Sequence, residues 1–235
     1  MSEYQITYGK SIISYTLVYS DRLTLGIKVY PDKSVKVTAP MDASLQKIEE
    51  KVHSKAAWIL KQQDFFLSFH PMTPPRRFIS GETHKYLGKQ YRLKVKENRI
   101  ESVKLQGGNI NVNVKDKNNS QRIEQLLKQW YKTKADVHFQ LLFDECLPLV
   151  STFYRGTPSL KYRWMDKRWG SCSRNGEILL NLELIKASKK SIEYVILHEF
   201  CHLVHMNHSA EFYTLLEKLS PDWRKIKDEL ERMMV

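Results

Sequence analysis

The sequence predicts an α+β fold, with a β-rich amino-terminal domain over residues 1–118 and a mostly helical carboxy-terminal domain over residues 119–235. Short runs that alternate apolar and polar residues, the pattern of half-buried strands, fill much of the first domain. In the second domain apolar residues recur at the three- and four-residue spacing of helices, except between residues 168 and 184. No internal repeat is visible in the sequence.

The first domain begins with three alternating runs, ISYTLVY, LTLGIKVY and SVKVTAP. Residues 43–69 are expected to form one helix, because apolar residues recur there at helix spacing. That helix should end before Pro71, Pro74 and Pro75, since proline cannot continue it. Further strands are expected in KYLGKQYRLKV and NINVNV, and the polar turn KDKNNS closes the domain near residue 118.

Strand-like alternation returns once in the second domain. RWGSCS, from Arg168 to Ser173, leads into Asn175-Gly176, a dipeptide that favours two-residue hairpin turns. The segment beyond it, EILLNLEL, places Ile178, Leu180, Leu182 and Leu184 on one face. We therefore expect a β-hairpin set among helices.

A buried helix should follow the hairpin. Ser188 can cap its amino terminus, and one apolar face is formed by Ile192, Val195, Ile196, Phe200 and Leu203. Asn207 can take the left-handed conformation that ends a helix and turns the chain back. Asn207 or Ser209 would then cap the next helix, EFYTLLEKL.

Composition restricts the class of protein. Hydrophobic residues make up 42% of the chain and charged residues 27%, as in ordinary globular domains. The first twenty residues lack the pattern of a signal peptide, and no run of apolar residues is long enough to span a membrane. The three cysteines, Cys146, Cys172 and Cys201, are odd in number and far apart, which favours reduced thiols over disulfides. We expect a cytoplasmic protein with no membrane partner, and we leave its oligomeric state open.

The formal net charge of +12 would attract phosphate backbones or acidic partners. The lysines and arginines are spread along the chain rather than gathered in one block. This distribution favours a solvated basic surface over a dedicated nucleic-acid site, so nucleic acid is expected only as a possible partner.

Four of the eight histidines fall between Tyr194 and Phe212. Two of them, His198 and His202, frame the sequence H-E-x-x-H and would lie on one face of a helix, one turn apart. Such a pair can hold one zinc ion, while Glu199 lies where it can deprotonate a water. The alternative is that these are core histidines satisfied by ordinary hydrogen bonds.

A zinc site of this kind needs a third protein ligand. His205 is a further turn along the helix, so we expect it to contact the metal-binding histidines and not the metal itself. We expect the same of Tyr194. Glu211 and Glu217 are expected on helix surfaces. His208 lies past the turn at Asn207 and can approach the metal from another direction, so it is the favoured third ligand.

The chain resembles the YgjP-like zinc metallopeptidases, which are related to the SprT-like and other zincin proteases. The resemblance is carried by RWGSCS, by H-E-F-C-H, by the N-H-S-x-x-F segment at Asn207–Phe212 and, less specifically, by GETHKYLGKQYRL at Gly81–Leu93. It implies a zincin-like fold, one Zn²⁺ per chain, and His208 as the third ligand. It also implies a strand beside the metal-binding helix, where an extended protein or peptide substrate adds as another strand.

That strand would come from the hairpin. Its substrate-binding candidates are Arg168, Trp169, Gly170, Ser171 and Cys172. Trp169 and Cys172 could instead only pack the hairpin onto the helix, and Cys172 could approach the metal and close the site as a structural one. Arg168, Tyr194 and His205 are candidates for contacting the carbonyl of the substrate.

Three classes of function therefore stay open. The favoured one is a zinc endopeptidase with Glu199 as general base. The second is a basic nucleic-acid-binding protein with a structural zinc, which would have no use for Glu199. The third is an interaction scaffold with an empty site. The first two combine in a peptidase that acts on proteins bound to nucleic acid.

Overall fold

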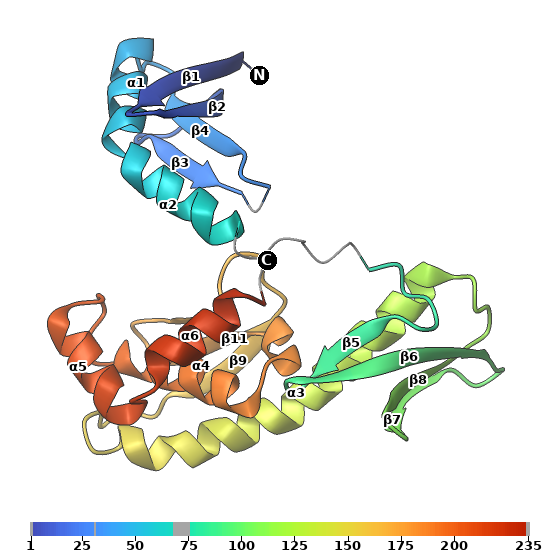
Figure 1. Ribbon diagram of the computed structural model, residues 1–235. Coiled ribbons are helices and arrows are strands. Elements are labelled where there is room, and N and C mark those ends of the chain that lie inside the picture. The colour runs from blue at the N-terminus through green and yellow to red at the C-terminus, as the bar shows by residue number, and fades with distance from the viewer. Residues whose placement is uncertain (1, 31, 68–75, 234–235) are drawn as a thin grey trace. The chain divides into compact units, whose positions relative to one another are not determined.

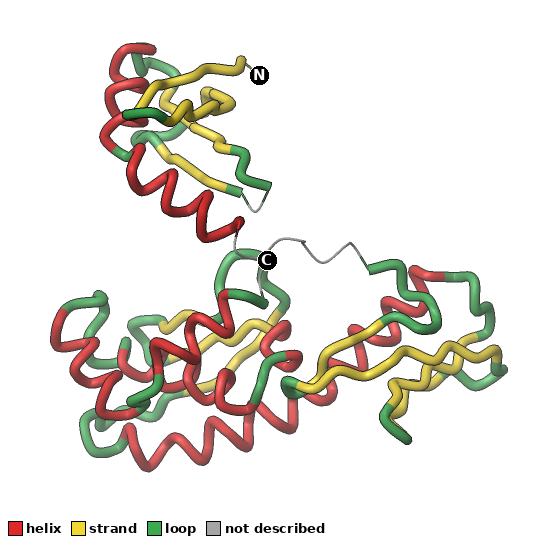
Figure 2. Tube along the Cα trace, viewed as in Figure 1, coloured by secondary structure: helices red, strands yellow, loops and turns green. Residues whose placement is uncertain are grey.

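The computed structural model describes residues 2–30, 32–67 and 76–233 of the chain. The chain divides into two compact units, Met1–Pro74 and Pro75–Met234. Figure 1 labels the elements of both units, and Figure 2 distinguishes their helices, strands and loops. Mixed α and β content with a β-rich amino-terminal part confirms the predicted fold class.

The first unit is a four-stranded sheet followed by two helices. Its strands are β1 (Ser2–Tyr8), β2 (Ser11–Ser20), β3 (Gly26–Val29) and β4 (Val35–Pro40), in the order β1-β2-β4-β3. Helices α1 (Leu45–Ser54) and α2 (Ala56–Leu67) bury Ile48, Val52 and Ile59 in the same core as the sheet. The single helix expected over residues 43–69 is thus broken at Lys55, which ends α1 in a non-helical conformation. Pro71, Pro74 and Pro75 lie outside the described residues.

The second unit opens with another four-stranded sheet. Its strands are β5 (Thr83–Tyr86), β6 (Lys89–Glu97), β7 (Ser102–Gln106) and β8 (Asn109–Val114), in the order β5-β6-β8-β7. Asn119 then caps α3 (Ser120–Val150), which runs from this sheet to the remaining elements of the unit (Figure 1). Despite the length of α3, no helix in the described part of the chain is both long and apolar enough to cross a membrane.

The two sheets share one topology. In each, the first pair and the last pair of neighbouring strands are antiparallel, and the central pair is parallel. Val37 of β4 lies between Leu17 and Ile27, and Val112 of β8 lies in the same way between Val95 and Val103. The chain therefore contains a structural repeat that was not visible in the sequence, because pairing and apolar period are kept while most residues differ.

The remaining elements form a smaller sheet with helices. Strands β9 (Ser159–Arg163), β10 (Gly170–Cys172) and β11 (Glu177–Asn181) lie in the order β10-β11-β9. They are followed by the 3-10 helix η1 (Leu182–Lys186) and by α4 (Lys189–Cys201), α5 (Ala210–Leu219) and α6 (Trp223–Glu231). Strand β10 is an edge strand of this sheet.

The predicted hairpin is present as β10 and β11, with three differences. Its loop spans Ser173–Gly176 rather than two residues, with Gly176 at a positive φ of 79°. The expected strand EILLNLEL ends at Asn181, because the Asn181 side chain caps η1. Strand β9, which pairs in parallel with β11, was not predicted.

Residues 76–118 belong to the second unit. Tyr86 and Leu93 share its core with Phe139 and Phe200, far along the chain. The turn between β5 and β6 also reaches η1, since the backbone N–H of Leu87 donates to the carbonyl of Ile185 at 2.9 Å. The boundary expected near residue 118 falls at the start of α3, whereas the division between the compact units lies between residues 74 and 75.

Candidate metal centre

Three histidine side chains meet at the carboxy-terminal end of α4. His198 comes from the last turn of α4, His202 directly follows the helix, and His208 lies in the loop before α5. Each ring offers one nitrogen as a ligand atom, and these three nitrogens lie within 4.8 Å of one another. Among the described residues, these three are the group of His, Cys, Asp or Glu side chains that lie close enough together to hold one metal ion.

The local fold explains how His208 returns to α4. The chain leaves the helix through a turn in which the His205 N–H donates to the carbonyl of Cys201 at 2.9 Å. Ser209, one of the two residues expected to do so, then caps α5. Asn207 does not have the expected left-handed conformation. Positive φ angles occur among the described non-glycine residues at Lys33, Phe78 and Leu87, and not at Asn207. Phe212, in the first turn of α5, places its ring 4.7 to 5.0 Å from all three histidine rings.

The electrostatics of the cluster suit a cation. Burial, together with the neighbouring His202 and His208, lowers the pKa of His198 to about 3, so its ring is neutral at pH 7. Burial also lowers the pKa of His208. The Nε2 atoms of His198 and His208 lie 3.1 Å apart, near the roughly 3.3 Å that separates two nitrogens on one tetrahedral zinc ion. Three imidazole rings whose ligand nitrogens lie this close together therefore fit a divalent metal such as zinc.

A backbone carbonyl orients one of these rings. The Nδ1 atom of His202 lies 3.0 Å from the carbonyl oxygen of His205. Because a carbonyl only accepts, Nδ1 must carry the proton, and Nε2 keeps its lone pair for a metal. His205 thus contacts a ligand from behind through its backbone rather than through its ring. Tyr194 is buried, and its ring meets that of His198 edge-on at 6.0 Å.

Glu199 lies beside the cluster and is 5% exposed. Burial raises the pKa of its carboxyl to about 8, and the charge of Arg168 partly offsets this effect. Strand β10 lies directly against this side chain, because a Cβ atom added to Gly170 would be 2.6 Å from the Glu199 Oε1 atom. The candidate base is therefore held between the metal-binding helix and an edge strand.

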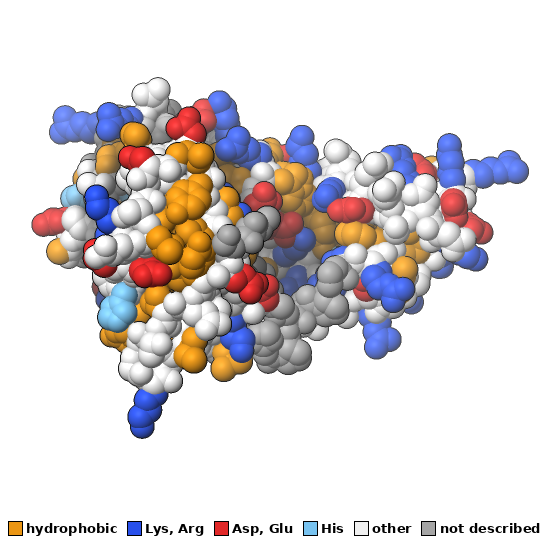
Figure 3. Space-filling model, turned by 90° about the horizontal axis from the view of Figure 1, so that it is seen from above, with side chains coloured by type: hydrophobic (Ala, Val, Ile, Leu, Met, Phe, Trp, Pro, Cys, Tyr) orange, Lys and Arg blue, Asp and Glu red, His pale blue; other side chains and the backbone are white. Residues whose placement is uncertain are grey.

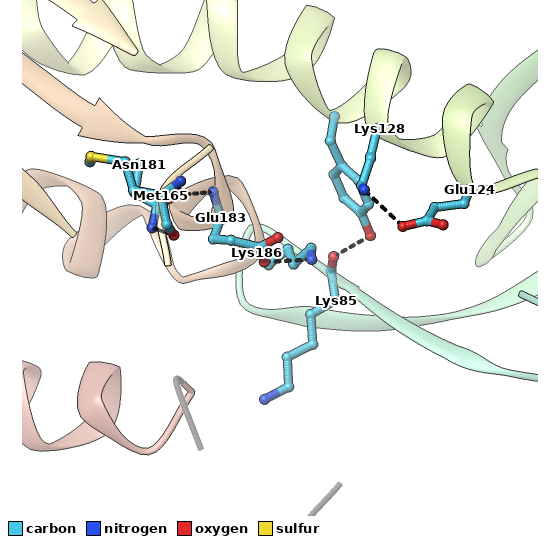
Figure 4. Close-up of polar contacts among 8 residues, drawn as sticks. Lys85, Glu124, Lys128, Met165, Asn181, Glu183 and Lys186 are labelled. Carbon is cyan, nitrogen blue, oxygen red and sulfur yellow. Dashed lines mark hydrogen bonds and ion pairs between the residues drawn. The ribbon is translucent and has the colours of Figure 1, made fainter. Parts of the chain in front are cut away.

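Asn181 holds the loop that leads into β10. Its amide donates to the carbonyls of Met165 (2.8 Å) and Arg168 (3.0 Å), and its side-chain oxygen accepts from the N–H groups of Met165 and Glu183. It is 1% exposed, and Figure 4 shows it close to Met165 and Glu183. The sequence did not single out Asn181, because it lies on the face of EILLNLEL opposite Ile178, Leu180, Leu182 and Leu184, where a polar residue is expected.

The other candidates lie around this arrangement without joining the histidine cluster. Trp169 and Ser171 are partly buried, and the Trp169 indole nitrogen is buried with no partner among the described residues. Burial and the nearby Glu199 raise the pKa of the Cys172 thiol to about 11. Glu211 accepts from the hydroxyl of Ser209, while Glu217 accepts from Trp223 and Arg224.

One solved structure and one family model match this chain. The chain is similar to the metallopeptidase zymogen of Methanocaldococcus jannaschii, jannalysin, with 17% identity over 41% of this chain and 97% of that chain, and a TM-score of 0.37. No curated protein sequence matches the chain. A family model described as YgjP-like, metallopeptidase domain, matches residues 23–233. The chain therefore belongs to the family of YgjP-like metallopeptidase domains.

Proposed function

We propose that the protein is a zinc-dependent endopeptidase in which Glu199 is the general base. The observation that carries this proposal is the meeting of three histidine ligands with a buried carboxylate and an edge strand. Membership of a metallopeptidase family supports a metal-dependent peptidase. The choice of zinc rests on the donor set, because three imidazoles and an open position are typical of catalytic zinc.

A zinc ion held by His198, His202 and His208 would polarise the peptide carbonyl and make a water more acidic. The charge of a cation held by the three histidines would lower the raised pKa of the Glu199 carboxyl and favour its ionised form. The ionised carboxylate would then accept a proton from the attacking water as the new carbon–oxygen bond forms. The same carboxyl would then give that proton to the leaving amine nitrogen as the carbon–nitrogen bond breaks. Its buried position excludes bulk water, which would otherwise compete for the proton.

Strand β10 would bind the substrate. It pairs with β11 along one side, and its other side has no strand partner among the described residues. An extended peptide could add there through backbone hydrogen bonds. The carboxylate of Glu199 would then face the substrate backbone at Gly170, and the exposed Arg168 would lie near the carbonyl to be attacked.

A structural zinc site is the competing proposal. A closed site would need a fourth protein ligand, for which Cys172 was the candidate. Cys172 is not part of the metal-binding group found among the described residues, and this supports a catalytic site.

The test is metal-dependent hydrolysis of an unfolded protein. Purified protein should contain about one zinc per chain. Chelation should abolish hydrolysis, and zinc should restore it. A protein that binds zinc fully yet cleaves no unfolded protein or peptide would contradict the endopeptidase and favour the structural role.

A further inference from the structure

We infer that the sheet β5–β8 carries a second functional surface, which binds the sugar–phosphate backbone of duplex nucleic acid. One face of this sheet packs on α3 through residues such as Leu93, Ile110 and Val112. The opposite face, called the outer face here, consists of the alternate residues of the four strands. These are Thr83, Lys85, Gln90, Arg92, Lys94, Lys96, Ser102, Lys104, Gln106, Asn109, Asn111 and Asn113.

The composition of the outer face is one-sided. Five of its residues are cationic, and the others are amides or hydroxyls, with no Asp, no Glu and no apolar side chain. An ordinary exposed sheet face mixes both signs of charge, which limits repulsion between like charges. Figure 3 shows what such a mixture looks like, with Lys and Arg next to Asp and Glu across the face drawn there.

The five cations form no ion pair with any described residue. Figure 4 shows the contrast within one view: Lys128 and Lys186 reach Glu124 and Glu183, whereas the side chain of Lys85 extends away from α3. The backbone at Lys85 is nevertheless fixed, because its carbonyl accepts from the Tyr131 hydroxyl at 2.8 Å. Unpaired cations on a rigid support can engage an anionic ligand without first breaking internal ion pairs.

Spacing and neighbours suit a polynucleotide. Arg92, Lys94 and Lys96 follow one another at two-residue intervals on β6, or about 6.8 Å. Asn109, Asn111 and Asn113 lie beside them in register on β8. Each asparagine amide donates within the sheet or its turn, while the amide oxygens accept no hydrogen bond from the described residues. The face thus offers charges for phosphates and acceptors for hydroxyl or amino groups of nucleotides.

The repeat in the first unit provides an internal comparison. Lys94, Asn111 and Lys104 lie side by side across three strands of the β5–β8 sheet. The residues at the same three positions of the β1–β4 sheet are Thr16, Lys36 and Lys28. The same face of the β1–β4 sheet also contains Glu3, Ile12 and Val18, so it is mixed and partly apolar. Because both sheets have the same topology, the fold alone does not require the one-sided face of β5–β8.

The chemistry of the face selects nucleic acid over the other anionic partners. Without an apolar side chain it has nothing to insert into a lipid bilayer or to bury in a protein interface. Without an aromatic side chain it cannot stack on unpaired bases, which is the usual mode for single strands. What remains is sequence-independent contact with phosphates of a duplex.

The experiment compares two variants of the full chain. Lys94→Gln with Lys104→Gln removes two charges from the outer face, and Lys28→Gln with Lys36→Gln removes two lysines from the corresponding rows of the other sheet. Each variant lowers the net charge of +12 by two, and thermal unfolding checks that each still folds. Binding to a labelled DNA duplex of about 20 base pairs is measured between about 50 and about 200 mM salt.

We expect the first variant to bind about tenfold more weakly at low salt, with a salt slope reduced by about two, and the second to bind like the wild type. Equal weakening in both variants would reduce the effect to net charge and overturn the proposal. Undetectable binding of wild-type protein at about 50 mM salt would also overturn it. So would face-dependent binding to phosphatidylserine vesicles or polyglutamate that matches or exceeds binding to DNA.

Discussion

The carboxylate of Glu199 and the backbone of Gly170 are in such close contact that no side chain fits between them. A Cβ atom on residue 170 would stand 2.6 Å from Oε1 and 2.9 Å from Cγ of Glu199, both closer than a normal contact. The glycine of RWGSCS is therefore required by the position of the base. Its φ is not in the left-handed region, so backbone freedom does not explain it.

Gly170→Ala should reduce peptide hydrolysis by about 100-fold, because the added methyl group displaces a reacting group by a fraction of an ångström or more. Metal content should be unchanged, since the three histidines do not contact residue 170 in this way. Ser171→Ala on the same strand is the control and should cost far less activity. Wild-type hydrolysis rates in Gly170→Ala would show that the position of Glu199 is not critical.

Glu199→Gln should keep the metal and lower peptide hydrolysis by at least ~100-fold, because an amide cannot take up the proton of the attacking water. Steady-state hydrolysis and metal content are measured on the same sample. Similar rates for wild type and variant, both with metal bound, would assign the activity to another site or to a contaminant.

His208→Ala should lose most of the bound zinc, because one of three ligands is removed. His205→Ala is its matched control, since the carbonyl that orients His202 belongs to the backbone and survives the substitution. Metal analysis after dialysis distinguishes the two variants. The assignment of the third ligand fails if His205→Ala is the variant that loses zinc.

Asn181→Ala should lower the free energy of unfolding by ~2–4 kcal/mol, because partly buried backbone groups of Met165, Arg168 and Glu183 lose their hydrogen bonds. Chemical denaturation measures this loss. Hydrolysis should also fall, since the loop that places Arg168 and Gly170 is released. Unchanged stability would mean that water replaces the Asn181 amide without cost.

His84 should make the second unit less stable in mild acid. Burial lowers the pKa of its ring, and Arg76 and Lys186 act in the same direction, while the hydrogen bond to Glu82 opposes them. The unfolded chain therefore takes up a proton near pH 6.5, where the folded protein does not yet do so. Stability contributed by neutral His84 is present above that pH and declines as the pH falls below it.

His84→Gln should remove this part of the pH dependence, at most about 1.4 kcal/mol per pH unit. Unfolding by denaturant is compared between pH 7 and pH 5.5 for both proteins. The same loss of stability in both over that interval would show that His84 makes no contribution to it.

The sequence predicted the parts of the site that depend on neighbouring residues. Ser188 caps α4 and Ser209 caps α5 as expected, and the spacing of His198 and His202 follows from the helix itself. It did not predict β9, whose parallel pairing with β11 depends on residues many positions away. The contact of Leu87 with Ile185 is similarly remote, so the sequence of residues 76–118 does not show that they pack with the elements after α3.

The left-handed turn expected at Asn207 was wrong for a related reason. Local propensity allows that conformation, but the contacts of Phe212 with all three histidine rings and the cap at Ser209 already determine the path of the chain. Asn181 was missed because three of its four side-chain hydrogen bonds reach Met165 and Arg168, which approach it only in the folded protein.

The repeated sheet topology creates a hazard during folding, since a strand of one sheet could take the place of its counterpart in the other. If β6 replaced β2 beside β4 with the apolar register kept, Lys94 would occupy the place of Thr16, directly opposite Lys36. Lys28, on the other side of Lys36, would add a third like charge to that row. Repulsion of this kind disfavours the exchanged arrangement, so the divergence of the two sheets helps each strand to find its own partners.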